Sequence, residues 1–296
     1  MGPDGTMITV APSGATMITV APTGAESVKA DRPTLPVTLD ELVTTAIACE
    51  QAGAALIHVH VRDEKAQPTL DPVILRDTVA ALREQTTLVI QLSTGGSVHD
   101  PLKDRLAVLE AEPDSCSLTC GTVNFGDDVF MNPWPFMVEL YRASQAAEVV
   151  PEFELFDLGH ATAMRRLLDS YGPPYGGAVH CDLVMGVPGG MPGTAAALVA
   201  AVAALPPACS WSATGIGRAH LPVALAALAA GGHLRVGMED VVTYAPRQAV
   251  RDNAQLVTRA AQLATIAQRP PMSIGGARAL LNIKDFRSVR GARRVH

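Results

Sequence analysis

Residues 54–60 read AALIHVH, an apolar run that ends in two histidines. Side chains alternate between the two faces of a β-strand, so Leu56, His58 and His60 are expected to share one face and point into a core. Short apolar or β-branched runs of this kind recur along the chain. They predict strands at residues 17–22, 55–61, 87–92, 116–120, 152–156, 179–184, 210–215 and 233–238.

Helical patterning fills the segments between these strands. Residues 39–51 follow a capping box formed by Thr38 and Glu41 and stop before Gly53, and further helices are expected at residues 195–205, 221–230 and 252–268. Strict alternation of strand and helix favours parallel strands joined by right-handed crossovers. Eight strands in 296 residues predict an α/β fold, the closed (β/α)8 TIM barrel. The alternative, a doubly wound open sheet, usually carries a Gly-x-Gly-x-x-Gly turn after its first strand, and no such turn occurs there.

A short repeat stands at the start of the chain. Residues 6–15 (TMITVAPSGA) return almost unchanged as residues 16–25 (TMITVAPTGA), a period far too short for a solenoid. We therefore interpret residues 1–16 as an N-terminal extension or duplicated segment. Residues 17–284 are expected to form a single catalytic TIM-barrel domain, followed by a basic tail at residues 285–296.

Composition excludes several classes of protein. Apolar residues make up 48% of the chain, which is ample for a large core and unlike a disordered chain. A net charge of −6 argues against nucleic acid as a partner. No apolar run is long enough to cross a bilayer, no secretory signal is visible, and five scattered cysteines indicate thiols in a reducing compartment. These observations predict a cytoplasmic protein without a membrane partner.

Polar residues gather where the predicted strands end, and active sites of TIM barrels lie at the C-terminal ends of the strands. Stability alone gives no reason to place ionisable groups there. The residues concerned are Glu26, His58, His60, Ser93, Ser117, Glu154, His180, Asp182, Arg218, Arg235, Glu239 and Asp240.

The two histidines predict half of a zinc site. Two inward imidazoles at a barrel mouth need one carboxylate and an open position to complete a catalytic zinc site. Glu239 and Asp240 follow the eighth strand, which lies only two strands from His58 and His60 in a closed barrel. One carboxylate can bind the metal while its neighbour acts as a base. The structural alternatives are a pair of core histidines and a helix N-terminus that favours acidic residues.

A glycine pair follows the third strand. Ser93 and Thr94 precede Gly95 and Gly96, and such a loop brings backbone N–H groups close to an anion. We therefore expect this loop to bind substrate.

Eight motifs then occur in an order typical of one family. They are TGAE at 23–26, IHVHVRD at 57–63, QLSTGG at 91–96, GTVNFG at 121–126, PEFE at 151–154, GVPGG at 186–190, GIGR at 215–218 and GHLRVGMED at 232–240. Together they closely resemble the β-keto acid cleavage enzyme family, typified by 3-keto-5-aminohexanoate cleavage enzymes. The resemblance covers residues 17–284.

The resemblance implies a zinc-dependent TIM barrel that is usually a homotetramer. Such a transferase condenses a β-keto acid with acetyl-CoA and yields acetoacetate and a new acyl-CoA, by Claisen and retro-Claisen chemistry. Carried over by motif, it makes the zinc ligands His58, His60 and Glu239, the catalytic residues Asp240 (the base), Arg235 and Glu26, and the substrate-binding residues Ser93, Gly95, Gly96, Ser117 and Glu154. Arg235 would orient Asp240 or the bound carboxylate. This chain departs from the family pattern at Ser117, usually Thr, and at Val241, often Asn.

Other functions are compatible with the same residues. A zinc-dependent hydrolase barrel also uses His-x-His, although on its first strand and with further histidine ligands. A metal-dependent aldolase or lyase on a TIM barrel is a second alternative. A zinc-stabilised binding protein is the non-enzymatic alternative, and an ionised Asp240 beside an open metal position argues against it.

Overall fold

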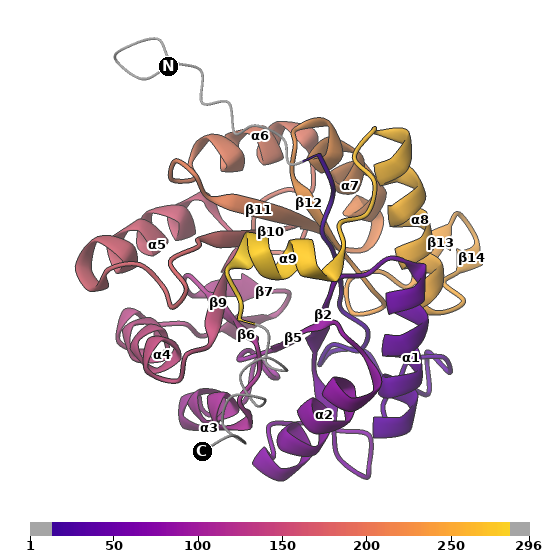
Figure 1. Ribbon diagram of the computed structural model, residues 1–296, viewed down its shortest axis with the longest axis horizontal. Coiled ribbons are helices and arrows are strands. Elements are labelled where there is room, and N and C mark those ends of the chain that lie inside the picture. The colour runs from indigo at the N-terminus through magenta and orange to yellow at the C-terminus, as the bar shows by residue number, and fades with distance from the viewer. Residues whose placement is uncertain (1–13, 285–296) are drawn as a thin grey trace, which may run out of the picture.

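The computed structural model describes residues 14–284 (Figure 1). The predictions for residues 1–13 and for the tail at 285–296 lie outside this range. Thr16, at the predicted end of the extension, is buried and pairs with Pro271 in an isolated parallel bridge.

Eight parallel strands close into a barrel, as predicted. Their order around the ring is β1-β12-β11-β10-β9-β6-β5-β2, so the doubly wound alternative is wrong. The bounds are β1 Ile18–Val20, β2 Leu56–Val59, β5 Val89–Leu92, β6 Ser115–Thr119, β9 Val150–Leu155, β10 His180–Met185, β11 Ser210–Gly215 and β12 His233–Val236. Each overlaps one of the eight predicted strands, with bounds that differ by at most two residues.

Helices surround this barrel on the outside (Figure 1). They are α1 Leu39–Ala52, α2 Pro72–Gln85, α3 Leu102–Ala107, α4 Trp134–Ala146, α5 Leu158–Tyr171, α6 Ala195–Ala203, α7 His220–Ala229 and α8 Asn253–Ile266, with short 3-10 turns at Val108–Ala111 and Gly217–Ala219. The predicted capping box is confirmed, because Thr38 accepts a hydrogen bond from the Glu41 amide and Glu41 accepts one from the Thr38 amide. Gly53 ends α1 in the left-handed conformation.

The two ends of the barrel are built differently. Helix α9, Ile274–Leu281, crosses the N-terminal end, where Leu281 packs with Met17, Leu56 and Val150 (Figure 1). The C-terminal end carries three hairpins instead: β3 Val61–Arg62 with β4 Pro68–Thr69, β7 Val123–Phe125 with β8 Asp128–Phe130, and β13 Thr243–Ala245 with β14 Gln248–Ala249. Apolar side chains therefore close the N-terminal end of the barrel, whereas the C-terminal end is available for a functional site.

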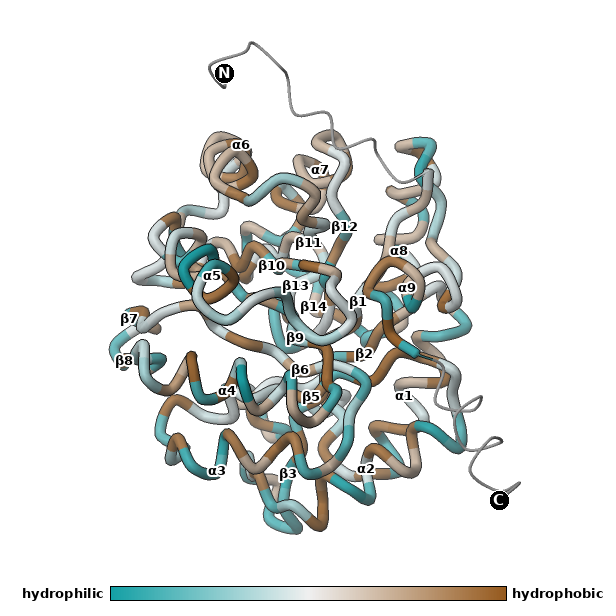
Figure 2. Tube along the Cα trace, turned by 60° about the vertical axis from the view of Figure 1, so that its left-hand side comes forward, coloured by the Kyte–Doolittle hydropathy of each residue, from teal (hydrophilic) through white to brown (hydrophobic). Residues whose placement is uncertain are grey.

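The outer faces of α6 and α7 are apolar. Figure 2 colours α6 in tan and brown throughout, whereas α5 includes teal segments. Val199 is 62% exposed, Leu221 39% and Leu225 47%. Within residues 14–284, no helix is both long and apolar enough to cross a membrane.

Candidate metal centre and catalytic pocket

A pocket of about 220 Å³ opens at the C-terminal ends of the barrel strands. Every residue that the family resemblance assigned to the site lines it except Ser117, and the strand-end residues His180, Asp182 and Arg218 also lie outside its lining. The ends of β2, β5, β9 and β12, the loops after them and the loop after β1 supply the polar side chains of the lining.

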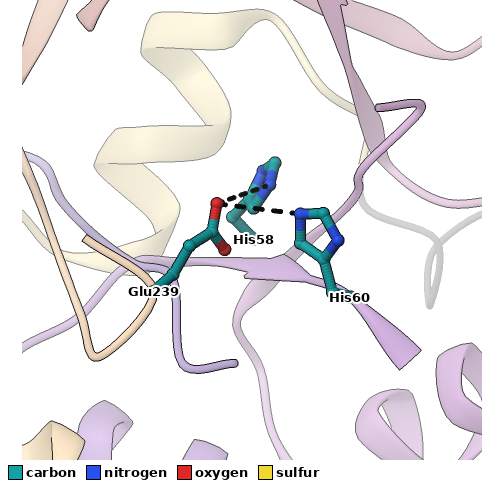
Figure 3. Close-up of side chains that lie close together, drawn as sticks. All are labelled: His58, His60 and Glu239. Atoms are coloured by element: carbon teal, nitrogen blue, oxygen red, sulfur yellow. Dashed lines mark ion pairs between the residues drawn. The ribbon is translucent and has the colours of Figure 1, made fainter. Parts of the chain in front are cut away.

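Three potential metal ligands converge at one side of this pocket (Figure 3). The ligand atoms of His58, His60 and Glu239 all lie within 4.8 Å of one another. Glu239 Oε1 is 3.8 Å from His58 Nε2 and 3.7 Å from His60 Nε2. The second oxygen of Glu239 is buried and has no hydrogen-bond partner. The donor atoms of the three side chains lie close enough together for one cation to contact all of them, so the residues present fit a bound metal.

Gln91 orients the first of these imidazoles. Its Oε1 lies 2.5 Å from His58 Nδ1, while its Nε2 donates to Ser115 Oγ at 3.2 Å. With the amide held in this orientation, His58 carries its proton on Nδ1 and directs the Nε2 lone pair toward Glu239. Burial lowers the pKa of His58 to about 3, which keeps the ring neutral. A neutral imidazole fixed by an outer hydrogen bond is typical of a metal ligand.

Glu239 is held ionised in the same place. Burial opposes its ionisation, but the adjacent Arg235 guanidinium outweighs burial and lowers the pKa of Glu239 to about 2. Two neutral histidines and one carboxylate, with an open side toward a pocket, form a donor set that can hold a metal ion.

Two glycines allow the backbone to bring Glu239 to the histidines. A Cβ at Gly237 would lie 1.9 Å from the carbonyl oxygen of Ala21, so only glycine permits the close approach of the chain beyond β12 to the end of β1. This approach also ends β12 at Val236, two residues before the predicted end. Gly24 has a φ of +65°, and a Cβ there would meet Glu239 Cγ at 2.6 Å.

Arg235 organises the neighbouring carboxylates. Its guanidinium is buried and donates to both oxygens of Asp240, from Nε at 3.2 Å and from Nη2 at 3.1 Å. It also donates to Glu154 Oε1 at 3.2 Å and to Glu239. Glu154 Oε2 accepts a further hydrogen bond of 2.8 Å from Thr119. Burial raises the pKa of Asp240 to about 7, although Arg235 opposes that rise.

The loop after β5 is supported from behind. Thr94 donates from its amide to Ser117 Oγ at 3.1 Å and from its hydroxyl to the Ser117 carbonyl at 2.7 Å. Ser117 therefore holds this loop and does not line the pocket. Ser93 lines the pocket and accepts a hydrogen bond from the Gly95 amide at 3.1 Å, so that amide is already engaged.

Glu26 reaches the pocket from the rim. It is exposed, on the loop that follows β1. Arg62 clamps this loop by donating to the carbonyl oxygens of Gly24 at 2.6 Å and Ser27 at 2.8 Å.

Several buried polar groups have roles that the sequence alone did not indicate. Gln91, Thr119 and Arg62 support site residues directly, as described above. Deeper in the barrel, His180 Nε2 lies 3.4 Å from Glu152 Oε2, and both side chains are buried outside the pocket lining. The alternation of side chains along a strand could have indicated that Glu152 points into the barrel, because it lies on the same face of its strand as Glu154.

Comparisons with known proteins agree with these features. A family model described as beta-keto acid cleavage enzyme matches residues 15–283. A 3-keto-5-aminohexanoate cleavage enzyme of Acetoanaerobium sticklandii is 34% identical over 262 residues, which cover 87% of this chain and 94% of that protein. A 3-oxoadipate:acetyl-CoA acetyltransferase of Cupriavidus necator is 35% identical over 266 residues, 87% of this chain and 91% of that protein. The solved complex of ObcA with oxaloacetate has a TM-score of 0.72 at 18% identity, covers 86% of this chain and 68% of that one, and shows a shared fold alone.

Proposed function

The chain belongs to the β-keto acid cleavage enzyme family, and on that premise we propose that it transfers the acyl group of a β-keto acid to coenzyme A. The substrates are R–CO–CH2–COO⁻ and acetyl-CoA, and the products are acetoacetate and R–CO–CoA. One observation carries the proposal. His58, His60 and Glu239 converge beside the buried Asp240 in a single pocket at the barrel mouth.

We propose that His58, His60 and Glu239 hold zinc. When bound, zinc supplies a Lewis acid toward the keto and carboxylate oxygens of the β-keto acid. The donor set supports this choice, because two imidazoles and one carboxylate with an open position are typical of catalytic zinc.

Asp240 is the proposed base. Arg235 fixes both of its oxygens, so the carboxylate meets the substrate in one orientation. Asp240 takes a proton from C2, and the C2 carbanion attacks the acetyl carbonyl of acetyl-CoA and expels the CoA thiolate. The thiolate then adds to the original keto carbon. The bond from that carbon to C2 breaks, its electron pair stays on C2, and Asp240 returns the proton to give acetoacetate.

The remaining residues bind and orient the substrate. Ser93 and Glu154 line the pocket on the side of β5 and β9, and Glu26 faces it from the loop after β1. Gly95 and Gly96 line the pocket beside Ser93, and Ser117 keeps this loop in place through Thr94.

Incubation with a β-keto acid and acetyl-CoA tests the proposal. Chromatography with mass spectrometry should detect acetoacetate and the new acyl-CoA in equal amounts, and removal of metal by a chelator should abolish both. Hydrolysis of the thioester without acyl transfer would favour the hydrolase alternative instead.

We further propose a homotetramer in a reducing, cytoplasmic compartment. Five buried free thiols among the described residues suit that compartment, and the apolar outer faces of α6 and α7 suit contact between subunits. Light scattering of the protein and of Leu225→Glu tests the assembly, because a charge on that face should lower the measured mass.

A further inference from the structure

The pocket has two chemically different walls. The polar wall lies over β2, β1 and β12 and contains the proposed metal ligands and Glu26. The apolar wall, as we call it, consists of Phe125, Phe130, Phe156, Val184, Val187 and Ile216. Its residues lie in or follow β9, β10 and β11 and the β7–β8 hairpin. In the ring order β9 is diametrically opposite β1, so the apolar wall faces the polar wall across the pocket.

The apolar wall is a rigid surface. The three phenylalanine rings pack edge to face, with centroids 6.2 to 6.4 Å apart. Arg105 stacks on Phe130 at 4.7 Å and donates to the carbonyl of Thr94 at 2.6 Å and to that of Met131 at 2.7 Å. The hairpin that carries Phe125 and Phe130 is therefore bound to the loop that carries Ser93.

A second carboxylate on the substrate would find no free cation in this pocket. Arg235 is the one arginine or lysine in the described lining, and Glu154, Glu239 and Asp240 already occupy its guanidinium. Arg105 is buried behind Phe130, and its guanidinium donates to two backbone carbonyls and to the side-chain oxygen of Asn132. An ionised group buried without a partner is strongly disfavoured.

The apolar wall also offers no binding site for an ammonium group on the substrate. A cation binds aromatic rings by lying over their faces within about 6 Å. Phe125, Phe130 and Phe156 pack on one another, so no space between them can enclose a cation. Among the pocket carboxylates, Glu154, Glu239 and Asp240 are engaged by Arg235, and Glu26 lies on the exposed rim of the opposite wall.

We propose that the β-keto acid of this enzyme carries an uncharged, apolar side chain R, which the apolar wall binds. This inference rests on the proposed function and narrows its substrate class. Burial of apolar carbon on this wall contributes about 0.8 kcal/mol per methylene, or roughly fourfold in affinity. The acyl-CoA product then carries the same apolar acyl group.

Three six-carbon β-keto acids give a matched test. They are 3-oxohexanoate, 3-oxoadipate and 3-keto-5-aminohexanoate, with an apolar, an anionic and a cationic side chain respectively. We expect kcat/KM for 3-oxohexanoate to exceed the other two values by about 10- to 100-fold. Calorimetry of each acid with the metal-loaded protein, without acetyl-CoA, should give the same order of affinity.

Arginine variants on the wall sharpen the test. Val187→Arg, or Ile216→Arg if the first variant does not fold, should raise kcat/KM for 3-oxoadipate at least about tenfold relative to that for 3-oxohexanoate. Val129→Arg is the matched control, because Val129 is 45% exposed on the same hairpin as Phe125 and lies outside the pocket lining. The control should leave both values unchanged.

The outcomes separate the inference from the function on which it rests. Preference of the wild type for 3-oxoadipate or 3-keto-5-aminohexanoate would overturn the inference and leave the function standing. The same follows if both wall variants raise KM for acetyl-CoA and leave the ratio between keto acids unchanged, because the wall would then bind the CoA thioester. Absence of acyl-CoA and acetoacetate with all three acids in the metal-loaded wild type would overturn the proposed function itself.

Discussion

Two histidine–carboxylate pairs lie inside the same barrel and differ in what surrounds them. His58 and His180 are both 1% exposed, and each binds a side-chain oxygen at Nδ1, from Gln91 at 2.5 Å and from Ser210 at 2.8 Å. Each directs Nε2 toward a carboxylate, Glu239 in the upper pair and Glu152 in the lower pair. The upper pair, His58 and Glu239, lies beside the His60 imidazole and lines the pocket. The lower pair, His180 and Glu152, lies deeper in the barrel and does not line the pocket.

The electrostatics of the two carboxylates are opposite. Burial raises the pKa of Glu152 to about 8, with further increases from Asp182 and Glu154 that Arg235 does not cancel. The pKa of Glu239 is lowered to about 2 in spite of burial. The upper pair thus presents a neutral imidazole and an anion, which suits a cation, while the lower pair consists of a protonated acid and a neutral imidazole. A histidine next to a carboxylate is therefore no metal site without a third donor and a stabilised negative charge.

Removal of the imidazoles should give the largest difference between the two pairs. His58→Ala and His60→Ala each remove one of three proposed ligands, so folded protein dialysed against a weak chelator should retain almost no zinc. His180→Ala should retain about one zinc per chain. Elemental analysis of the dialysed proteins measures the zinc content. Full zinc content in both His58→Ala and His60→Ala would mean that His58 and His60 are ordinary core histidines.

Substitutions of the adjacent residues Glu239 and Asp240 should impair the enzyme in different ways. Asp240→Asn cannot accept a proton, so turnover should fall roughly 10²–10⁴-fold while zinc remains bound. Glu239→Ala should instead release zinc readily to a chelator. Exchange of the substrate C2 protons with deuterated water, followed by NMR without acetyl-CoA, reports the proton step directly.

Wild-type enzyme should accelerate that exchange above the uncatalysed rate, and Asp240→Asn should not. Unchanged exchange in zinc-loaded Asp240→Asn would exclude Asp240 as the base. Zinc loss from the Asp240 variant, together with retention in the Glu239 variant, would reverse the two roles.

The outer hydrogen bonds of the two imidazoles should also differ in effect. Gln91→Leu removes the acceptor that fixes the His58 ring, and zinc affinity should fall about 10- to 100-fold. Ser210→Ala makes the equivalent change at His180 and should leave zinc affinity unaltered. Competition with a chromophoric chelator measures both constants, and equal affinities in wild type and Gln91→Leu would contradict the orienting role.

The smallest effect is expected from the lower carboxylate. Because the pKa of Glu152 is raised to about 8, the folded state keeps a proton that the unfolded chain releases near its ordinary pKa of 4.5. The stability that this proton confers is complete below pH 4.5 and is lost as the pH rises toward 8. Glu152→Gln removes this dependence, so its free energy of unfolding relative to wild type should rise by about 1–3 kcal/mol between pH 5 and pH 8.

Urea unfolding at pH 5, 6.5 and 8 measures this difference. Glu110→Gln is the control, since Glu110 is exposed at the surface and should show no such trend. Parallel pH profiles for Glu152→Gln and wild type would mean that Glu152 ionises normally in the folded protein.

The barrel itself was predictable from sequence because short apolar or β-branched runs recur along the chain, with helical patterning between them and polar residues near their ends. The capping box at Thr38 and Glu41 and the breaker Gly53 likewise act through local contacts. Alternation also identified the inward parity of His58 and His60. The hairpin that carries Phe125 and Phe130 was not predicted, because its strands are short and exposed at the barrel mouth.

The sequence did not reveal how far along the barrel axis each inward side chain lies. Glu152 and Glu154 have equal parity in the PEFE motif, yet Glu154 binds Arg235 at the pocket and Glu152 lies below it. Gln91 meets His58 because β2 and β5 pair in that register, which a single sequence does not reveal. Ser117 lies on the predicted strand, but its hydroxyl accepts a hydrogen bond from Thr94 behind the pocket lining.

The position of β1 between β2 and β12 has a consequence for the order of assembly. His58 and His60 leave the ribosome early, and Glu239 follows only when the last barrel strand has been made. The three-ligand site therefore exists only after the ring has closed across β1, and an incomplete chain offers two imidazoles at most. An ion at a hundred times its dissociation constant stabilises the closed ring by about 2.7 kcal/mol. A metal bound at the proposed site would thus stabilise the closure of the ring where the first and last strands meet.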